Sequence, residues 1–142
     1  MSKFNFIDNS EKILDLLEDK KGEALEAMGL AAEGWAKANL TKFPRVDTGR
    51  LRNSVSHAQN KDYEYIGTNV TYASYVEHGT GPYAENDDGT YAGGRTDIPW
   101  FYKDDKGVGH LSYGMKPAHF LKNAVADHKD DLKRIAEKTM RS

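Results

Sequence analysis

A chain of 142 residues, 38% of them hydrophobic, is long enough to form one domain around a single core. Its 20 basic and 22 acidic residues give a net charge of −2 without a strongly basic stretch, which argues against sequence-specific binding of nucleic acid. The absence of cysteine excludes disulfide bonds and thiolate metal sites, and no apolar run approaches the ~20 residues of a membrane span. We therefore expect a soluble protein with one domain over residues 1–142.

A long helix is predicted over about residues 9–42, where apolar side chains recur at helical spacing. Asp8 and Glu11 have the spacing of a capping box at its start, and Pro44 disfavours helix in the residue before it. The apolar stripe, which should face a core or a partner, consists of Leu14, Leu17, Leu25, Met28, Ala32 and Trp35. Each glycine inside the helix costs about 1 kcal/mol relative to alanine, so we expect a bend or break near Gly22.

The segment VDTGRLRNSV, which begins at Val46, has the pattern of a junction between this helix and a run of strands. Asp47 is placed to cap a short helical turn, and Gly49 allows the chain to turn closely. Such a turn would direct Leu51 and Val55 towards the core. The junction should therefore serve mainly as scaffold.

Strands and turns dominate the middle of the chain. Residues 54–68 predict a hairpin about a polar NKD turn, with packing residues Tyr63, Tyr65 and Ile66. A helical turn should follow, because apolar residues recur at i, i+3 and i+4 in Tyr72, Tyr75 and Val76, and Gly79 is a plausible cap at its C-terminal end.

The region after Gly79 is rich in glycine, acidic and hydroxyl residues, and we expect a mobile loop over residues 80–97. IPWFYKDDKGVGHLSYG, from Ile98, predicts a second hairpin about the turn DDKG. Pro117 should open a last helix, since proline is tolerated in a first helical turn. Its apolar face would comprise Leu121, Ala124, Val125, Leu132, Ile135 and Ala136. The expected fold is α+β: long N-terminal and C-terminal helices packed on a small, mainly antiparallel sheet.

Glu77 admits two readings. Its carboxylate is placed to pair with Arg50 or Arg52 across the junction. Alternatively, Glu77 and His78 would be the acid and base of a small hydrolase. Adjacent helical residues point about 100° apart, and no serine or cysteine nucleophile motif accompanies the pair. The hydrolase is therefore the weaker hypothesis, and we expect no catalytic residues.

No metal or cofactor site is predicted. The five histidines never occur at the i, i+4 spacing of a helical zinc site, and thiols are absent. ENDDGT resembles the middle of a calcium loop, but Ala84 and Arg95 occupy the first and twelfth positions, where carboxylates are needed. The glycine-rich segments lack the lysine of a phosphate loop.

Three sequence blocks occur in order: VDTGRLRNSV, YASYVEHGTG from Tyr72 and KGVGHLSYGMKPAHFLKNAV from Lys106. Together they resemble the gene-product-ten tail-component family of lambdoid siphophages, over roughly residues 20–140. The residues that match the family pattern are Asp47, Thr48, Gly49, Leu51, Ser54, Tyr72, Ala73, Tyr75, Val76, Glu77, Gly79, Thr80, Pro117, Phe120, Leu121 and Ala124. The family often has arginine and proline where this chain has Ala118 and His119, so the resemblance does not carry a charged contact to that position.

The resemblance implies a structural virion protein of a tailed phage or prophage, a head-tail joining or tail-completion subunit at the neck or upper tail. A tail terminator, or another subunit that caps the tail tube, is the alternative. The implied partners are further copies of the chain in a ring and neighbouring neck, connector or tail-tube proteins. Genome DNA in the assembled lumen is a further partner that such a role allows.

The second hairpin offers a candidate interface. Four large apolar or aromatic residues crowd one arm, more than one buried face of a short strand needs: Ile98, Trp100, Phe101 and Tyr102. Such side chains are typical interface anchors. In the alternative reading, the protein's own helices cover both faces of the hairpin.

Overall fold

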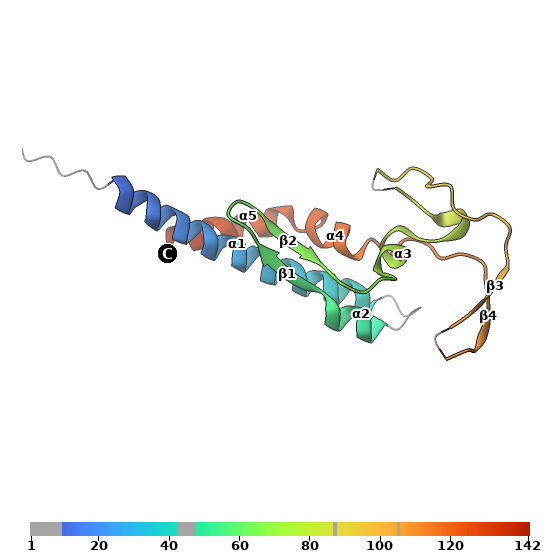
Figure 1. Ribbon diagram of the computed structural model, residues 1–142. Coiled ribbons are helices and arrows are strands. Elements are labelled where there is room, and N and C mark those ends of the chain that lie inside the picture. Colours follow the sequence, from blue (N-terminus) through green and yellow to red (C-terminus); the bar gives the residue numbers. More distant parts are fainter. Residues whose placement is uncertain (1–9, 43–47, 87, 105) are drawn as a thin grey trace, which may run out of the picture.

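The computed structural model describes residues 10–42, 48–86, 88–104 and 106–142, and confirms the predicted α+β class (Figure 1). In chain order the elements are α1 Ser10–Thr41, α2 Thr48–Ser54, β1 Ser56–Gln59, β2 Glu64–Gly67, α3 Ala73–His78, a 3₁₀ turn at Gly81–Tyr83, β3 Trp100–Lys103, β4 Gly109–Ser112, α4 Phe120–Ala126 and α5 Lys129–Arg141. The predicted caps Asp8 and Asp47, and Pro44, lie outside the described residues.

Helix α1 is uninterrupted from Ser10 to Thr41, so the predicted break near Gly22 is wrong. The first hairpin and helices α2, α4 and α5 all pack on α1. These tertiary contacts offset the helix-weakening effect of the glycines, which is about 1 kcal/mol each. Tertiary packing, rather than intrinsic propensity, therefore keeps the helix continuous.

The strands form two separate antiparallel hairpins rather than one sheet. Strands β1 and β2 pair from Ser56 with Gly67 to Gln59 with Glu64, and this hairpin lies along α1. Strands β3 and β4 pair from Trp100 with Ser112 to Lys103 with Gly109. Figure 1 places the second hairpin at the end of the molecule opposite the start of α1. Both predicted hairpins are thus confirmed, but only the first belongs to the helical body.

The C-terminal helical region is two helices, because α4 ends at Ala126 and α5 begins at Lys129. Pro117 does not open the helix as predicted: α4 starts three residues later, after His119 adopts a left-handed conformation with φ of 50°. His128, at the joint, stacks on Trp35 of α1 with ring centroids 3.9 Å apart. Helix α5 then runs back along α1 (Figure 1).

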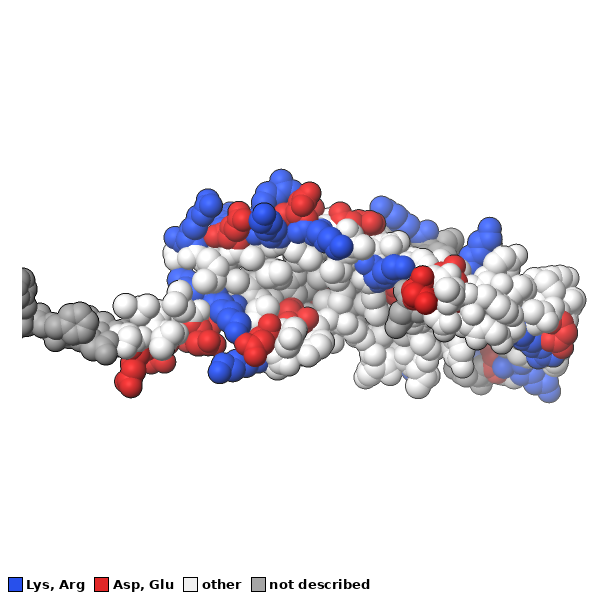
Figure 2. Space-filling view, turned by 90° about the horizontal axis from the view of Figure 1, so that it is seen from above, with Lys and Arg blue, Asp and Glu red and all other residues white. Residues whose placement is uncertain are grey.

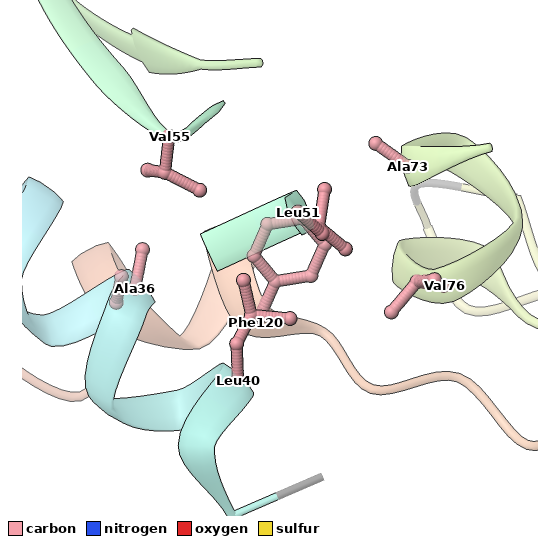
Figure 3. Packing of buried hydrophobic residues seen from close by; sticks show 8 residues of the cluster. Ala36, Leu40, Leu51, Val55, Ala73, Val76 and Phe120 are labelled. Carbon is pink, nitrogen blue, oxygen red and sulfur yellow. The ribbon is translucent and has the colours of Figure 1, made fainter. Parts of the chain in front are cut away.

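The core is small and lies where α1, α2, α3 and α4 meet. Its buried members are Ala36, Leu40, Leu51, Val55, Ala73, Val76, Phe120 and Ala124. Figure 3 shows Phe120 reaching between Leu40 and Leu51. The predicted burial of Leu51 and Val55 is confirmed, with exposed fractions of 0% and 2%. All three sequence blocks supply core residues, so the blocks build the scaffold of the fold.

Candidate interaction surface

An aromatic groove forms where the end of α3 meets the second hairpin. It encloses about 460 Å³ and is lined by Tyr72, Tyr75, Thr80, Trp100, Tyr102, Ser112 and Met115. Three residues of the YASYVEHGTG block therefore share one surface with two of the predicted interface residues, Trp100 and Tyr102. Spacing along the chain does not connect these two segments, because they lie about 25 residues apart.

Two features hold the hairpin in place beside α3. Backbone hydrogen bonds join Thr80 and Met115, the shorter running 2.8 Å from the Thr80 amide to the Met115 carbonyl. Gly81, with φ of 63°, lies under Trp100, where even a Cβ atom would come within 3.0 Å of the indole ring. The Arg95 guanidinium lies 5.4 Å from the centre of that ring. Trp100 is thus half-buried, with Gly81 and Arg95 as neighbours.

The opposite face of the hairpin is open to solvent. Phe101 pairs with Leu111 across the two strands, and these side chains are 62% and 63% exposed. Ile98 and Tyr102 are also exposed. The protein's own helices therefore do not cover both faces of this hairpin, contrary to the alternative reading. Large apolar side chains paired in this way on an exposed strand are typical of surfaces that bind a partner.

Asp104 stabilises the turn of this hairpin through hydrogen bonds. Its carboxylate accepts hydrogen bonds from His110 Nε2 and from the backbone amides of Lys106 and Val108, each at 2.9 Å. These hydrogen bonds hold the pKa of Asp104 below its usual range. The bond from His110 contributes most, and the bond from the Val108 amide contributes next. This fixes the arm that presents Phe101 and Leu111.

A second exposed apolar surface lies at the start of α1. Ser142 Oγ, at the end of α5, is 3.4 Å from Lys20 Nζ, so the first ten residues of α1 extend beyond the partner helix. Exposed apolar side chains in this overhang are Ile13, Leu14, Leu16 and Leu17. The predicted apolar stripe of the helix is therefore divided: Ala32 is buried and Leu25, Met28 and Trp35 are half-buried, but Leu14 and Leu17 face solvent.

Glu77 caps helix α4. Its two carboxylate oxygens accept the backbone amides of Leu121 at 2.8 Å and Lys122 at 3.1 Å. These are donors of the first turn of α4, and His119, the residue at the cap position, makes no side-chain cap. A buried acid from a distant helix thus takes the place of a local cap, and this role was not foreseen from the sequence.

The predicted ion pair of Glu77 with Arg50 or Arg52 is wrong. Among the described residues, no ion pair joins Glu77 to either arginine. The Arg52 guanidinium donates instead to Thr41 Oγ1 at 3.3 Å, and that of Arg50 lies 5.9 Å from the centre of the Tyr72 ring. The buried carboxylate is satisfied by backbone amides, which a sequence pattern does not reveal.

The geometry gives the hydrolase hypothesis no support. Glu77 is occupied by the amides of α4, and His78 Nδ1 lies 3.2 Å from the Ser74 carbonyl one turn earlier in the same helix. The carboxylate and the imidazole do not form an acid–base pair.

A polar cluster lies between α1 and the first hairpin. His57 Nε2 is 2.8 Å from Glu26 Oε1, and its Nδ1 is 3.4 Å from Glu33 Oε1. The hydrogen bond with Glu26 is the main reason that the pKa of His57 is raised, while burial raises the pKa of Glu64 nearby. The sequence gives only a weak signal for this cluster. Glu26 and Glu33 are two helical turns apart and so share a face of α1, but their spacing along the chain does not show which strand residues they meet.

Figure 2 shows basic and acidic side chains interspersed over the helical part of this face. Towards the other end charged side chains are fewer, apart from a cluster of both signs at the tip. No helix in the described part of the chain is long and apolar enough to cross a membrane. These features define a small α+β protein with exposed apolar groups at both ends and others on the first hairpin.

Comparison with known proteins identifies the family. Residues 4–79 match the family model described as "Bacteriophage HK97-gp10, putative tail-component". The match covers more than half of the chain and includes the first sequence block and most of the second, so the chain belongs to this family of bacteriophage tail components and the resemblance to the family is confirmed. No curated protein and no solved structure matched the chain.

Proposed function

We propose that this tail component is a head-tail joining or tail-completion subunit at the neck or upper tail of the virion. It works as a ring of identical subunits that contacts neighbouring neck, connector or tail-tube proteins and catalyses no reaction. The observation that carries the proposal is the second hairpin, with Phe101 and Leu111 exposed on one face and the aromatic groove on the other.

The exposed apolar side chains support an assembly role. Ile13, Leu16, Phe101 and Leu111 are each more than half exposed. Exposed large apolar groups of this kind are expected of a subunit whose surface becomes covered by neighbours.

The placement of the exposed apolar groups supports a ring. The α1 overhang and the second hairpin lie at opposite ends of the molecule (Figure 1). A contact between two different surfaces of identical subunits is heterologous, and repeated heterologous contacts close into a ring when the rotation per subunit allows. The overhang of one copy against the hairpin of the next would bury both surfaces.

Paired substitution of Phe101→Ala and Leu111→Ala tests the proposal. Both side chains are exposed, so the free energy of unfolding should change by no more than about 0.5 kcal/mol for each. We expect a folded subunit by circular dichroism that no longer enters phage particles, leaving unjoined heads and tails. Tyr63→Ala, which removes an aromatic side chain 64% exposed on the first hairpin, is the matched control and should assemble normally.

The results separate the alternatives. Normal incorporation of the double variant would remove this face of the hairpin from the interface. A tail terminator would instead leave tails of irregular length, visible by electron microscopy. The companion variant Trp100→Ala with Tyr102→Ala probes the groove face: loss of assembly with retained fold makes it an interface, and unfolding makes it part of the core.

A further inference from the structure

Three metal-ligating side chains come together between α1 and the first hairpin. Glu26 lies on α1, His57 on β1 and Glu64 on β2, and one potential ligand atom from each lies within 4.8 Å of the other two. The strand register places Gln59 opposite Glu64 and His57 opposite Ile66, so His57 and Glu64 share the face of the hairpin that meets α1. The cluster thus joins residues from three elements on one side of the molecule.

Glu64 places a carboxylate between α1 and the first hairpin without a hydrogen-bond partner. Both of its carboxylate oxygens are buried and neither has a hydrogen-bond partner. Its side chain fills the space above Gly29, where an added Cβ atom would come within 2.0 Å of Glu64 Oε1. An unpartnered buried carboxylate is strongly unfavourable, so such a group calls for a proton or a cation.

Within this cluster the protein supplies a cation only through His57, whose imidazole is charged when it is protonated. Glu33 adds a third carboxylate, and its ion pair with Lys37, at 3.5 Å, is directed away to the next turn of α1. Gln59 Nε2 makes a long contact of 3.5 Å with Glu26 Oε2. Three carboxylates around one imidazole therefore leave an excess of negative charge.

We propose that Glu26, His57 and Glu64 bind a first-row divalent transition-metal ion of the Zn²⁺ type, which fastens the first hairpin to α1. One imidazole nitrogen and two carboxylate oxygens form a three-ligand set that such ions accept, with a fourth position left for water. Small side-chain rotations must draw the donors together, because Zn–N and Zn–O distances are about 2.0 to 2.2 Å. Glu26 is exposed and gives the ion a route from solvent.

Glu33 acts as a positioning residue for His57. Its Oε1 lies 3.4 Å from Nδ1, which leaves Nε2 facing the ligand set. A carboxylate that accepts the second ring N–H of a metal-bound histidine fixes its orientation, and loss of such a partner weakens metal binding about 10- to 100-fold.

Zinc titration of the full chain by calorimetry, with Co²⁺ absorption and thermal unfolding as further readouts, tests the site. We expect one Zn²⁺ per chain, a rise in melting temperature that EDTA reverses, and a Co²⁺ visible spectrum. Mg²⁺ should not replace Zn²⁺, because it prefers oxygen ligands and octahedral geometry. If the wild-type chain does not bind Zn²⁺, the proposal is wrong and Glu64 is a protonated buried acid.

Variants distinguish a metal site from a structural polar cluster. Glu64→Gln removes the buried charge, so its metal-free melting temperature should be at least that of the wild type, while the Zn²⁺-dependent rise disappears. His57→Ala should also lose the rise, and Glu33→Gln should weaken binding about 10- to 100-fold. His110→Ala is the matched control, because His110 also pairs with a carboxylate, Asp104 at 2.9 Å, but lies outside the cluster. Zinc stabilisation that survives Glu64→Gln, or is lost in His110→Ala, would place the ion elsewhere.

Discussion

Glu77 links α3 to α4 through a single buried side chain, and its loss should weaken the whole helical junction. Glu77→Ala leaves the amides of Leu121 and Lys122 without acceptors, and we expect a loss of about 1 to 3 kcal/mol in the free energy of unfolding. Glu77→Gln, which keeps one acceptor oxygen, should lose less. Urea unfolding followed by circular dichroism measures both changes. The exposed carboxylate Glu137 serves as control, and an equal loss in Glu137→Ala would refute the capping role.

Gly79 ends α3 in a backbone conformation that other residues rarely adopt, with φ of 83° and ψ of 177°. A Cβ atom at this position would also come within 2.7 Å of the Met115 carbonyl and 2.8 Å of the Tyr83 carbonyl. Gly79→Ala should therefore destabilise the protein by at least about 1 to 3 kcal/mol. Gly34→Ala, on an open part of α1, should act in the opposite direction and stabilise by up to about 1 kcal/mol. Thermal unfolding of the two variants shows whether each substitution lowers or raises the melting temperature.

At the scale of an element, the loop over residues 80–97 should be mobile in the free subunit, but not uniformly. The amides of Glu85, Asn86 and Ala92 donate backbone hydrogen bonds at 2.8 to 2.9 Å, so they should exchange more slowly than those of Gly93 and Gly94. Hydrogen exchange measured by mass spectrometry or NMR resolves this pattern. Strong protection across the whole loop in the monomer would show that it packs on its own domain.

The turn of the second hairpin should respond to acid. Hydrogen bonds from His110 and the backbone keep the pKa of Asp104 in the folded protein below its pKa in the unfolded chain. The carboxylate therefore stabilises the turn fully at pH values above the unfolded pKa. The contribution is lost as the pH falls through the lower, folded pKa. NMR should show lower protection factors for the Lys106 and Val108 amides in acid, each measured against the intrinsic exchange rate at the same pH. Asp104→Asn should show the lower protection factors already at neutral pH and lose their pH dependence.

At the scale of the whole molecule, assembly should tolerate salt. The net charge is −2, and the side chains proposed to make the ring contacts are apolar. Raising the salt concentration from about 0.1 M to about 1 M shortens the screening length from about 10 Å to about 3 Å, which weakens charged contacts but not apolar ones. We expect undiminished incorporation of purified subunit into particles in an in vitro joining assay. A steep fall with salt would show that charged residues hold the ring.

Much of the local structure follows from the sequence alone. Helical periodicity identified α1 to within a residue or two, turn residues located both hairpins, and the spacing of Leu51 and Val55 indicated that both reach the core. The family follows from the sequence blocks as well. These features depend on residues close together along the chain, where propensity and spacing suffice.

Tertiary structure decided the rest, because the relevant partners are far apart in sequence. Gly22 stays helical since other elements pack on α1, and Glu77 meets α4 rather than an arginine because the fold brings the amides of Leu121 and Lys122 to it. The aromatic groove and the cluster of Glu26, His57 and Glu64 likewise join separate elements. Periodicity shows which face of an element is apolar, but the burial of that face depends on which other elements pack against it. Ala32 is buried and Leu14 is 60% exposed, although both lie on the predicted apolar stripe.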